Sequence, residues 1–167
     1  MIKTFLTTAF ALLGFAGSAD AHVTAMPDTA PARSHFVAHF VVPHGCGGAP
    51  TVALRITLPD GLSEVKPENK PGWTINIERY KFAGNGPQPP GPPTAIEWRG
   101  GPLPDSEFET FSILMLLPPN PGTLYFPTVQ TCTKGANNWV HIPAEGQQWH
   151  DVQEPAPFVR VTAAAAQ

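Results

Sequence analysis

The sequence predicts an all-β protein with an immunoglobulin- or fibronectin-like β-sandwich of about eight short strands. After residue 21, no long segment has helical periodicity, whereas alternation of apolar and polar residues recurs. The 167 residues include 21 prolines, which block helix interiors and mark strand ends. Turn sequences that combine Pro or Asp with Gly separate the apolar stretches, at 59–61, 70–72 and 120–122. The length favours a single domain.

The alternation is clearest over residues 35–42, 51–58, 73–78 and 111–117. In the first of these segments the apolar side chains share one face, and His35 and His39 lie on the other. Shorter strands are expected at 94–98, 123–126, 138–142 and 158–162. The Gly- and Pro-rich segment 84–93 is expected to be a loop within the one domain, because strand patterns on both sides are needed for one core.

Residues 1–21 have the pattern of a signal peptide. Lys3 precedes an apolar run over 5–16, and Ala19 and Ala21 supply the small residues that signal peptidase recognises. The run is too short for a permanent membrane span, and no second long apolar run follows. We therefore expect a periplasmic or secreted domain over 22–162 without a membrane span, followed by a disordered tail at 163–167.

Charge and motifs exclude several classes of function. The net charge is −3 and no stripe of Lys or Arg is present, which argues against a nucleic-acid partner. The chain contains no nucleophile elbow, no paired-cysteine redox motif and no phosphate-binding glycine loop. We therefore expect a binding protein and not an enzyme.

Cys46 and Cys132 are the two cysteines of the chain. In an exported protein such a pair predicts a disulfide, here joining an early strand end to a late one. By chain entropy, a bridge across this separation contributes up to about 4 kcal/mol. The alternative is a pair of soft, metal-binding thiols.

His22 is the first residue of the expected mature chain. Cleavage after Ala21 would free its α-amine, and that amine and the imidazole Nδ1 can bind one metal together, an arrangement called a histidine brace. Two nitrogens in fixed geometry suit Cu(II), which also leads the divalent metals in affinity. The alternative is that His22 follows the cleavage site by chance, and a cut shifted by one residue would abolish the chelate.

Motifs along nearly the whole mature chain resemble a known family. They are HVT at 22–24, VPHGCGGAPT at 42–51, LPDG at 58–61, KPGW at 70–73, WRGGPLP at 98–104, FPTVQTC at 126–132, IPAEG at 142–146 and PAP at 155–157. In this order and spacing they resemble the YcnI-like family, defined as the domain of unknown function DUF1775 and linked to copper.

The resemblance implies an exported β-sandwich that binds one Cu(II) by a single-histidine brace, in copper homeostasis or trafficking. It also implies a tryptophan near the metal, which we place at Trp139 from the segment before IPAEG. A carboxylate ligand is plausible, and Glu107 and Glu109 are the candidates because they share a strand face just after the GGPLP turn at 100–104. Glu145 is a weaker candidate. The expected partners are the copper ion and a separate periplasmic copper carrier or membrane copper transporter.

Alternatives stay open for several of these residues. Trp139 could instead be a buried sandwich tryptophan beside the disulfide. Trp149 lies in a polar segment and is expected at the surface. His44, with His141 and His150, could approach His22, but a solvated histidine is the ordinary state. The alternative functions are a copper mono-oxygenase acting on polysaccharide and a metal-free interaction module.

Overall fold

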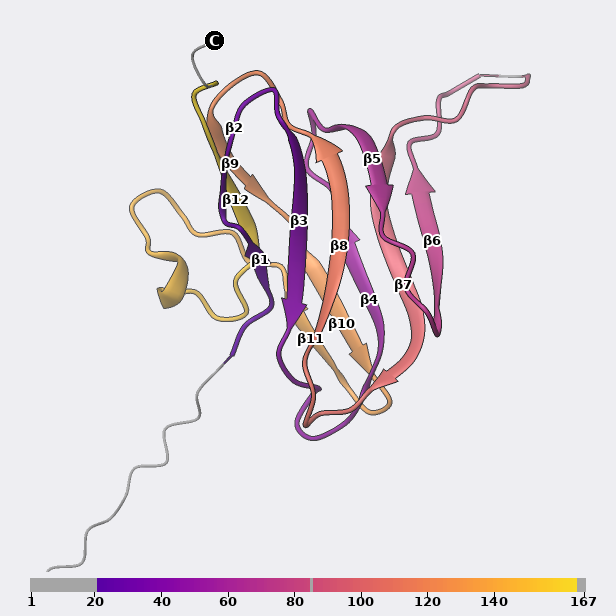
Figure 1. Ribbon diagram of the computed structural model, residues 1–167, viewed down its shortest axis with the longest axis vertical. Coiled ribbons are helices and arrows are strands. Elements are labelled where there is room, and N and C mark those ends of the chain that lie inside the picture. Colours follow the sequence, from indigo (N-terminus) through magenta and orange to yellow (C-terminus); the bar gives the residue numbers. More distant parts are fainter. Residues whose placement is uncertain (1–20, 85, 165–167) are drawn as a thin grey trace, which may run out of the picture.

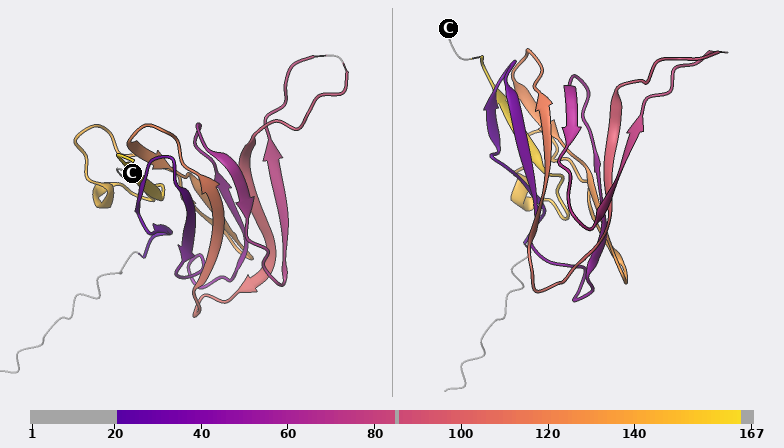
Figure 2. Two further views of the ribbon diagram at one scale, coloured as in Figure 1. Left: turned by 45° about the horizontal axis from the view of Figure 1, so that its top comes forward. Right: turned by 45° about the vertical axis from the view of Figure 1, so that its right-hand side comes forward.

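The computed structural model describes residues 21–84 and 86–164. Within these ranges two β-sheets pack face to face, and a smaller third sheet lies beside them (Figures 1 and 2). The expected all-β sandwich is therefore confirmed. The signal peptide predicted for residues 1–21 lies outside the described residues apart from Ala21, as does the end of the predicted tail. None of the helical structure in the described ranges is long and apolar enough to cross a membrane.

The two larger sheets form the sandwich. The first sheet has the strand order β1 (Thr24–Met26), β3 (His35–Val42), β8 (Glu109–Leu116) and β5 (Ser63–Pro67). The second has the order β11 (Ala136–Trp139), β10 (Thr128–Cys132), β4 (Thr51–Thr57), β7 (Pro93–Leu103) and β6 (Trp73–Arg79). The third consists of β2 (Thr29–Pro31), β12 (Phe158–Thr162) and β9 (Gly122–Tyr125).

The described chain has twelve strands instead of about eight. All eight expected segments form strands, and β1, β2, β5 and β10 are additional. β1 and β2 have three residues each, too few to display an alternation. In β10 the buried positions are Thr128, Gln130 and Cys132, so its inward face is mostly polar and gives no hydrophobic signal.

The core lies mainly between the two larger sheets, and Ala30, Val159 and Val161 extend it to the third sheet. The apolar positions of β3 are buried from Phe36 to Val42, as their alternation predicts. Trp98 of β7 is fully buried and packs edge-on against Phe111 of β8, with ring centroids 5.5 Å apart. Trp73 packs against the same ring at 5.0 Å. Both tryptophans therefore pack in the core around Phe111.

A disulfide joins Cys46 and Cys132, which confirms the prediction and excludes the alternative of metal-binding thiols. Cys46 lies in the corner that follows β3, and Cys132 ends β10. The bond therefore links the ends of strands in two different sheets. This link matters below, because the corner at residues 43–50 forms one wall of the candidate site.

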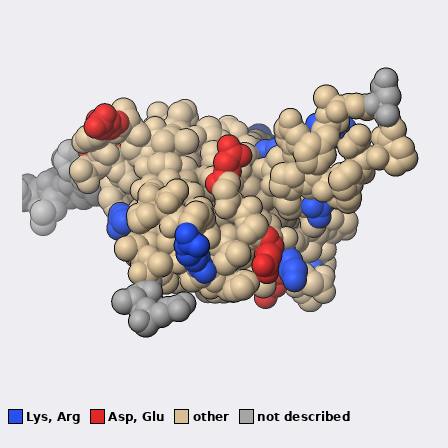
Figure 3. Space-filling model, turned by 90° about the horizontal axis from the view of Figure 1, so that it is seen from above, with Lys and Arg blue, Asp and Glu red and all other residues tan. Residues whose placement is uncertain are grey.

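Two connections extend outside the sandwich. The segment between β6 and β7 projects from one end (Figure 2), and it exposes the aromatic rings of Tyr80 and Phe82. The segment between β11 and β12 loops out on the opposite side and contains the 3₁₀ helix η1 (Trp149–Asp151). On the face seen in Figure 3, charged side chains are few and scattered among uncharged ones.

Candidate metal centre

His22 is brought to the candidate site by the pairing of β1 with β3. Thr24 lies opposite Val41 and Met26 lies opposite His39. Continuing this register two residues back places His22 level with Pro43, next to the corner after β3. The first residue of the expected mature chain therefore lies at the end of the first sheet, where it is half-buried.

The His22 side chain lines an open cavity of about 890 Å³. Other segments complete the wall: the corner after β3, the turn before β8, strand β11 and the loop around η1. The residues that they contribute are His44, Gly47, Gly48, Asp105, Asn137, Trp139 and 150–154. The cavity thus combines imidazole, carboxylate and amide groups from segments far apart in the sequence.

Two tryptophans contact the imidazole of His22 edge to face. The ring centroid of Trp139 lies 5.5 Å from that of His22, and that of Trp149 lies 5.3 Å away. Trp139 is 4% exposed and belongs to the core cluster, so it serves the core and the cavity together. Trp149, expected at the surface, is half-buried there: its Nε1–H donates to the Ala156 carbonyl at 2.7 Å and holds the ring against this edge.

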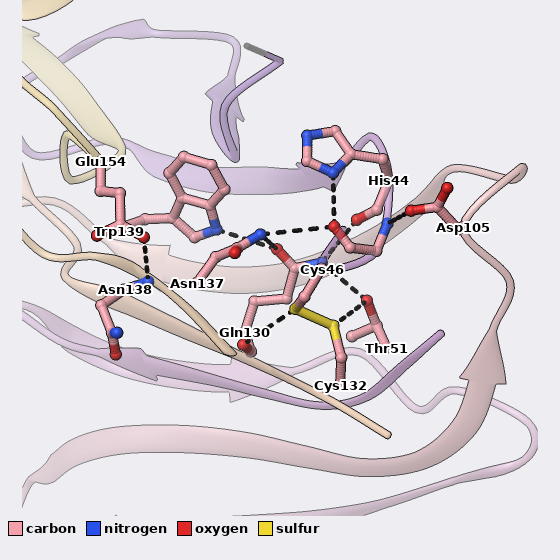
Figure 4. The surroundings of a disulfide bond; sticks show 11 residues. His44, Cys46, Thr51, Asp105, Gln130, Cys132, Asn137, Asn138, Trp139 and Glu154 are labelled. Atoms are coloured by element: carbon pink, nitrogen blue, oxygen red, sulfur yellow. Dashed lines mark hydrogen bonds between the residues drawn. A yellow bond between two sulfur atoms is a disulfide. The ribbon is translucent and has the colours of Figure 1, made fainter. Parts of the chain in front are cut away.

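The buried amide of Gln130 connects opposite walls of the cavity (Figure 4). Its Nε2 donates to the His44 carbonyl at 2.6 Å and to Thr51 Oγ1 at 2.8 Å. Its Oε1 accepts from the indole Nε1–H of Trp139 at 3.0 Å. Gln130 therefore fixes the corner that carries His44 relative to the tryptophan that contacts His22.

His44 is half-buried and uses both ring nitrogens. Nδ1 lies 2.6 Å from the carbonyl oxygen of Gly45, and Nε2 lies 2.7 Å from the carbonyl oxygen of Ala21. Its ring centroid is 6.5 Å from that of Trp139. His44 is therefore partly exposed, as expected of a solvated histidine, but two backbone carbonyls hold its ring. The motif at 42–51 contains His44, but its contacts with Ala21 and Trp139 come from segments distant in the sequence.

The structure does not bring Glu107 or Glu109 into this cavity. Strand β3 lies between β1 and β8, so the Glu109 backbone is two strand spacings, roughly 10 Å, from the β1 backbone. Its carboxylate instead pairs with Lys70 Nζ at 2.9 Å. Glu107 is exposed in the turn before β8, and Glu145 is exposed in the long loop before β12.

The pKa of Glu109 reflects its pairing with Lys70. Partial burial alone would raise the pKa of this carboxyl. The hydrogen bonds from Lys70 and from the Thr110 N–H, together with the Lys70 charge, outweigh burial and lower it below its ordinary value. The ionised carboxylate is therefore already engaged by a cation.

The carboxylates that do line the cavity are Asp105, Asp151 and Glu154. Asp105 Oδ1 accepts the Gly45 N–H at 3.0 Å, and Glu154 Oε1 accepts the Asn138 N–H at 2.9 Å. Each of these two therefore has one oxygen fixed at the wall (Figure 4). Their sequence context has no motif that distinguishes them from the other acidic residues.

Among the described residues, side chains alone do not give this cavity a complete set of metal ligands. Within residues 21–84 and 86–164, no three His, Cys, Asp or Glu side chains are grouped closely enough to hold a metal ion. The backbone nitrogen of His22 is a poor metal ligand while it belongs to the peptide bond with Ala21. Once freed, it would add an amine beside an imidazole, and this nitrogen pair suits Cu(II). The residues present fit a copper ion only in the cleaved form.

The comparisons with known proteins agree with this fold. The family model described as "Domain of unknown function (DUF1775)" matches residues 22–161. The chain belongs to the DUF1775 family. The resemblance drawn from the sequence motifs is therefore confirmed, and the matched segment begins at His22.

One solved structure similar to the DUF1775 domain is that of an uncharacterized protein from Nocardia farcinica, described as having an immunoglobulin-like fold. The two are 27% identical, with 85% of this chain and 99% of that chain covered and a TM-score of 0.67. This similarity supports the immunoglobulin-like sandwich. A comparison with curated proteins found no match.

Proposed function

We propose that this DUF1775 domain is an exported protein that holds one Cu(II) through the amine and Nδ1 of His22. The observation that carries the proposal is the position of His22. Its imidazole lines a cavity rich in nitrogen and oxygen atoms, and the carbonyl oxygen of the preceding residue, Ala21, contacts His44 of the same cavity. A metal bound there would take neutral nitrogens from one residue and meet carboxylates on the wall.

The chemistry requires hydrolysis of the peptide bond between Ala21 and His22. Water adds across this bond, Ala21 leaves as the carboxylate of the released leader, and the His22 nitrogen becomes an amine. The family match from residue 22 and the Cys46–Cys132 disulfide support a processed, exported domain. Bound copper would be cargo for a separate carrier or transporter.

The two tryptophans shield one side of the proposed copper centre from water. The Trp139 and Trp149 rings contact the His22 imidazole, so they limit its rotation and exclude water there. Asp105 and Glu154 on the cavity wall replace Glu107 and Glu109 as the carboxylates best placed to reach the metal. The Cu(II) would thus be held in a preorganised cavity, as ligand orientation by surrounding groups requires.

Titration with Cu(II), monitored by calorimetry and chelator competition, tests the proposal. The protein must be isolated after export, with its first residue verified as His22 by intact mass. We expect one Cu(II) per chain, and we expect His22→Ala to abolish tight binding. His35→Ala is the matched control, because His35 lies on the outer face of β3 and pairs with Glu64. A mature chain that starts elsewhere, or a His22→Ala variant with unchanged affinity, would refute the proposal.

The alternatives have their own tests. Oxidised sugar products formed from polysaccharide with copper and a reductant would establish a mono-oxygenase. Absence of Cu(II) binding by the correctly processed protein would favour a metal-free interaction module.

A further inference from the structure

We infer that His44 is a third nitrogen ligand of the proposed copper centre, and that cleavage before His22 uncovers it. The inference rests on the proposed function and extends it, since the family resemblance implies a brace with a single histidine. It assigns a metal-binding role to a side chain that the strand pattern leaves without a function.

The orientation of the His44 ring is the first argument. Nδ1 lies 2.6 Å from the Gly45 carbonyl oxygen, which can only accept a hydrogen, so this contact places the hydrogen on Nδ1. A histidine that ligates a metal typically donates its other ring N–H to a carbonyl or carboxylate. Nε2 also faces a carbonyl oxygen, that of Ala21, but only while Ala21 is attached. After cleavage Nδ1 keeps its acceptor, and Nε2 is the nitrogen whose lone pair is available to a metal.

The occupant of the space in front of Nε2 is the second argument. The Ala21 carbonyl oxygen lies 2.7 Å from Nε2, and the carbon of the same carbonyl group is bonded to the His22 nitrogen. One peptide group therefore covers both nitrogens. Hydrolysis of the Ala21–His22 bond removes this group, and it leaves the new amine and His44 Nε2 facing the space that the carbonyl filled.

The rigidity of the corner is the third argument. The His44 carbonyl accepts a hydrogen bond from Gln130 at 2.6 Å, and the Gly45 N–H donates to Asp105 at 3.0 Å. Cys46 anchors the corner through its disulfide. A Cβ on Gly45 would lie 2.0 Å from the Ala49 carbonyl oxygen, so the backbone here is closely packed. His44 is thus held in place before any metal arrives, as a ligand should be.

A consequence is that the precursor and the mature protein differ in their copper chemistry. In the precursor, the His22 nitrogen is an amide and Nε2 of His44 is covered. After cleavage, two imidazoles and one amine surround the same space. The domain would therefore acquire its full affinity for Cu(II) only after export and processing.

The decisive experiment counts imidazoles on Cu(II) by pulsed electron paramagnetic resonance of the wild-type protein that starts at His22. We expect the modulation pattern of two coordinated imidazoles. In chelator competition, we expect His44→Ala to bind Cu(II) at least about tenfold more weakly while keeping one site. His150→Ala is the matched control, since His150 also lines the cavity but is exposed, and we expect its affinity to stay within about twofold of the wild type.

A pattern of one imidazole in the wild type, or equal affinities of His44→Ala and His150→Ala, would overturn the inference. The wild-type spectrum decides even if His44→Ala does not fold. Failure of the proposed function is distinguishable, because the wild type would then bind no Cu(II) or His22→Ala would bind as tightly as the wild type. Loss on His22→Ala together with an unaffected His44→Ala would refute only the role of His44.

Discussion

At the scale of single residues, the amide of Gln130 has the most connections around the candidate site. It is fully buried and links the His44 carbonyl, Thr51 Oγ1 and the Trp139 indole. A buried polar group that loses its partner costs about 1–3 kcal/mol. Several such groups depend on this one side chain, which explains why a polar residue occupies an inward position of β10.

We predict that Gln130→Leu lowers the free energy of unfolding by about 2–4 kcal/mol, because it leaves the Trp139 N–H and the His44 carbonyl without a partner. Urea denaturation measures this loss. Asn137→Ala is the control, since Asn137 is only half-buried and its bonds to Gln130 and Gly45 are 3.4 Å and 3.5 Å long. It should cost less than about 1 kcal/mol, and equal losses for the two variants would contradict the assigned role of Gln130.

The tryptophans supply a second prediction at this scale. Trp139 and Trp149 contact His22, whereas Trp73 and Trp98 pack against Phe111. If Cu(II) binds at His22, it should quench the fluorescence of the first pair, and Trp139→Phe and Trp149→Phe should each remove part of the quenching. Trp73→Phe is the control, which should leave the copper-dependent loss of emission intact. A control that removes as much quenching would place the metal elsewhere.

At the scale of elements, the corner at 43–50 connects the two larger sheets through its disulfide. Strand β3 belongs to the first sheet and β10 to the second, and the Cys46–Cys132 disulfide ties their ends together across 86 residues of sequence. The same corner carries His44 and faces β1. The placement of the cavity wall and the stability of the sandwich therefore depend on one covalent link.

We predict that Cys46→Ser combined with Cys132→Ser lowers the free energy of unfolding by about 2–4 kcal/mol, through the larger entropy of the unfolded chain. Urea denaturation of the oxidised wild type and of the double variant gives the value. Reduced wild type is the control and should match the variant. If the corner loosens as well, affinity for Cu(II) should fall together with stability, whereas unchanged affinity would show that Gln130 suffices to hold His44.

At the scale of the whole molecule, two ion pairs between different strands or segments make the free energy of unfolding depend on pH. Glu78 of β6 accepts hydrogen bonds from Arg55 of β4, which outweigh the effect of partial burial and lower the pKa of the Glu78 carboxyl. The same hydrogen bond raises the pKa of Arg55. Lys70 and Glu109 form the second pair, with the lowered carboxyl pKa described above.

We predict that the stability contributed by these pairs is complete at neutral pH and is lost on acidification. Because each folded carboxyl has a lowered pKa, the unfolded state binds more protons as the pH falls below about 4.5, the ordinary value. Both carboxylates are about 40% exposed, so each effect should be under about 1 kcal/mol. Urea denaturation between pH 3 and 7 (a range about the ordinary carboxyl pKa) should show a shallower decline for Glu78→Gln. An unchanged pH profile would contradict the assignment.

Local patterns in the chain were sufficient for the sandwich, for eight of its strands and for the disulfide. Apolar and polar residues alternate along a strand that buries one face, and this alternation is visible in the sequence itself, as in β3. The motifs also led to the DUF1775 family, and the predicted cleavage site drew attention to His22. Strand β10 escaped this reading because its inward face is mostly polar.

The surroundings of His22 required the folded chain. His44, Trp149 and Glu154 lie in a corner and a loop without periodicity, and they meet only because β1 pairs with β3 and the loop before β12 folds back on this edge. Glu109 shows the reverse: it looked suitable in the sequence, yet strand β3 separates it from β1. Contacts between distant segments are set by packing of whole sheets, and no local pattern of residues encodes them.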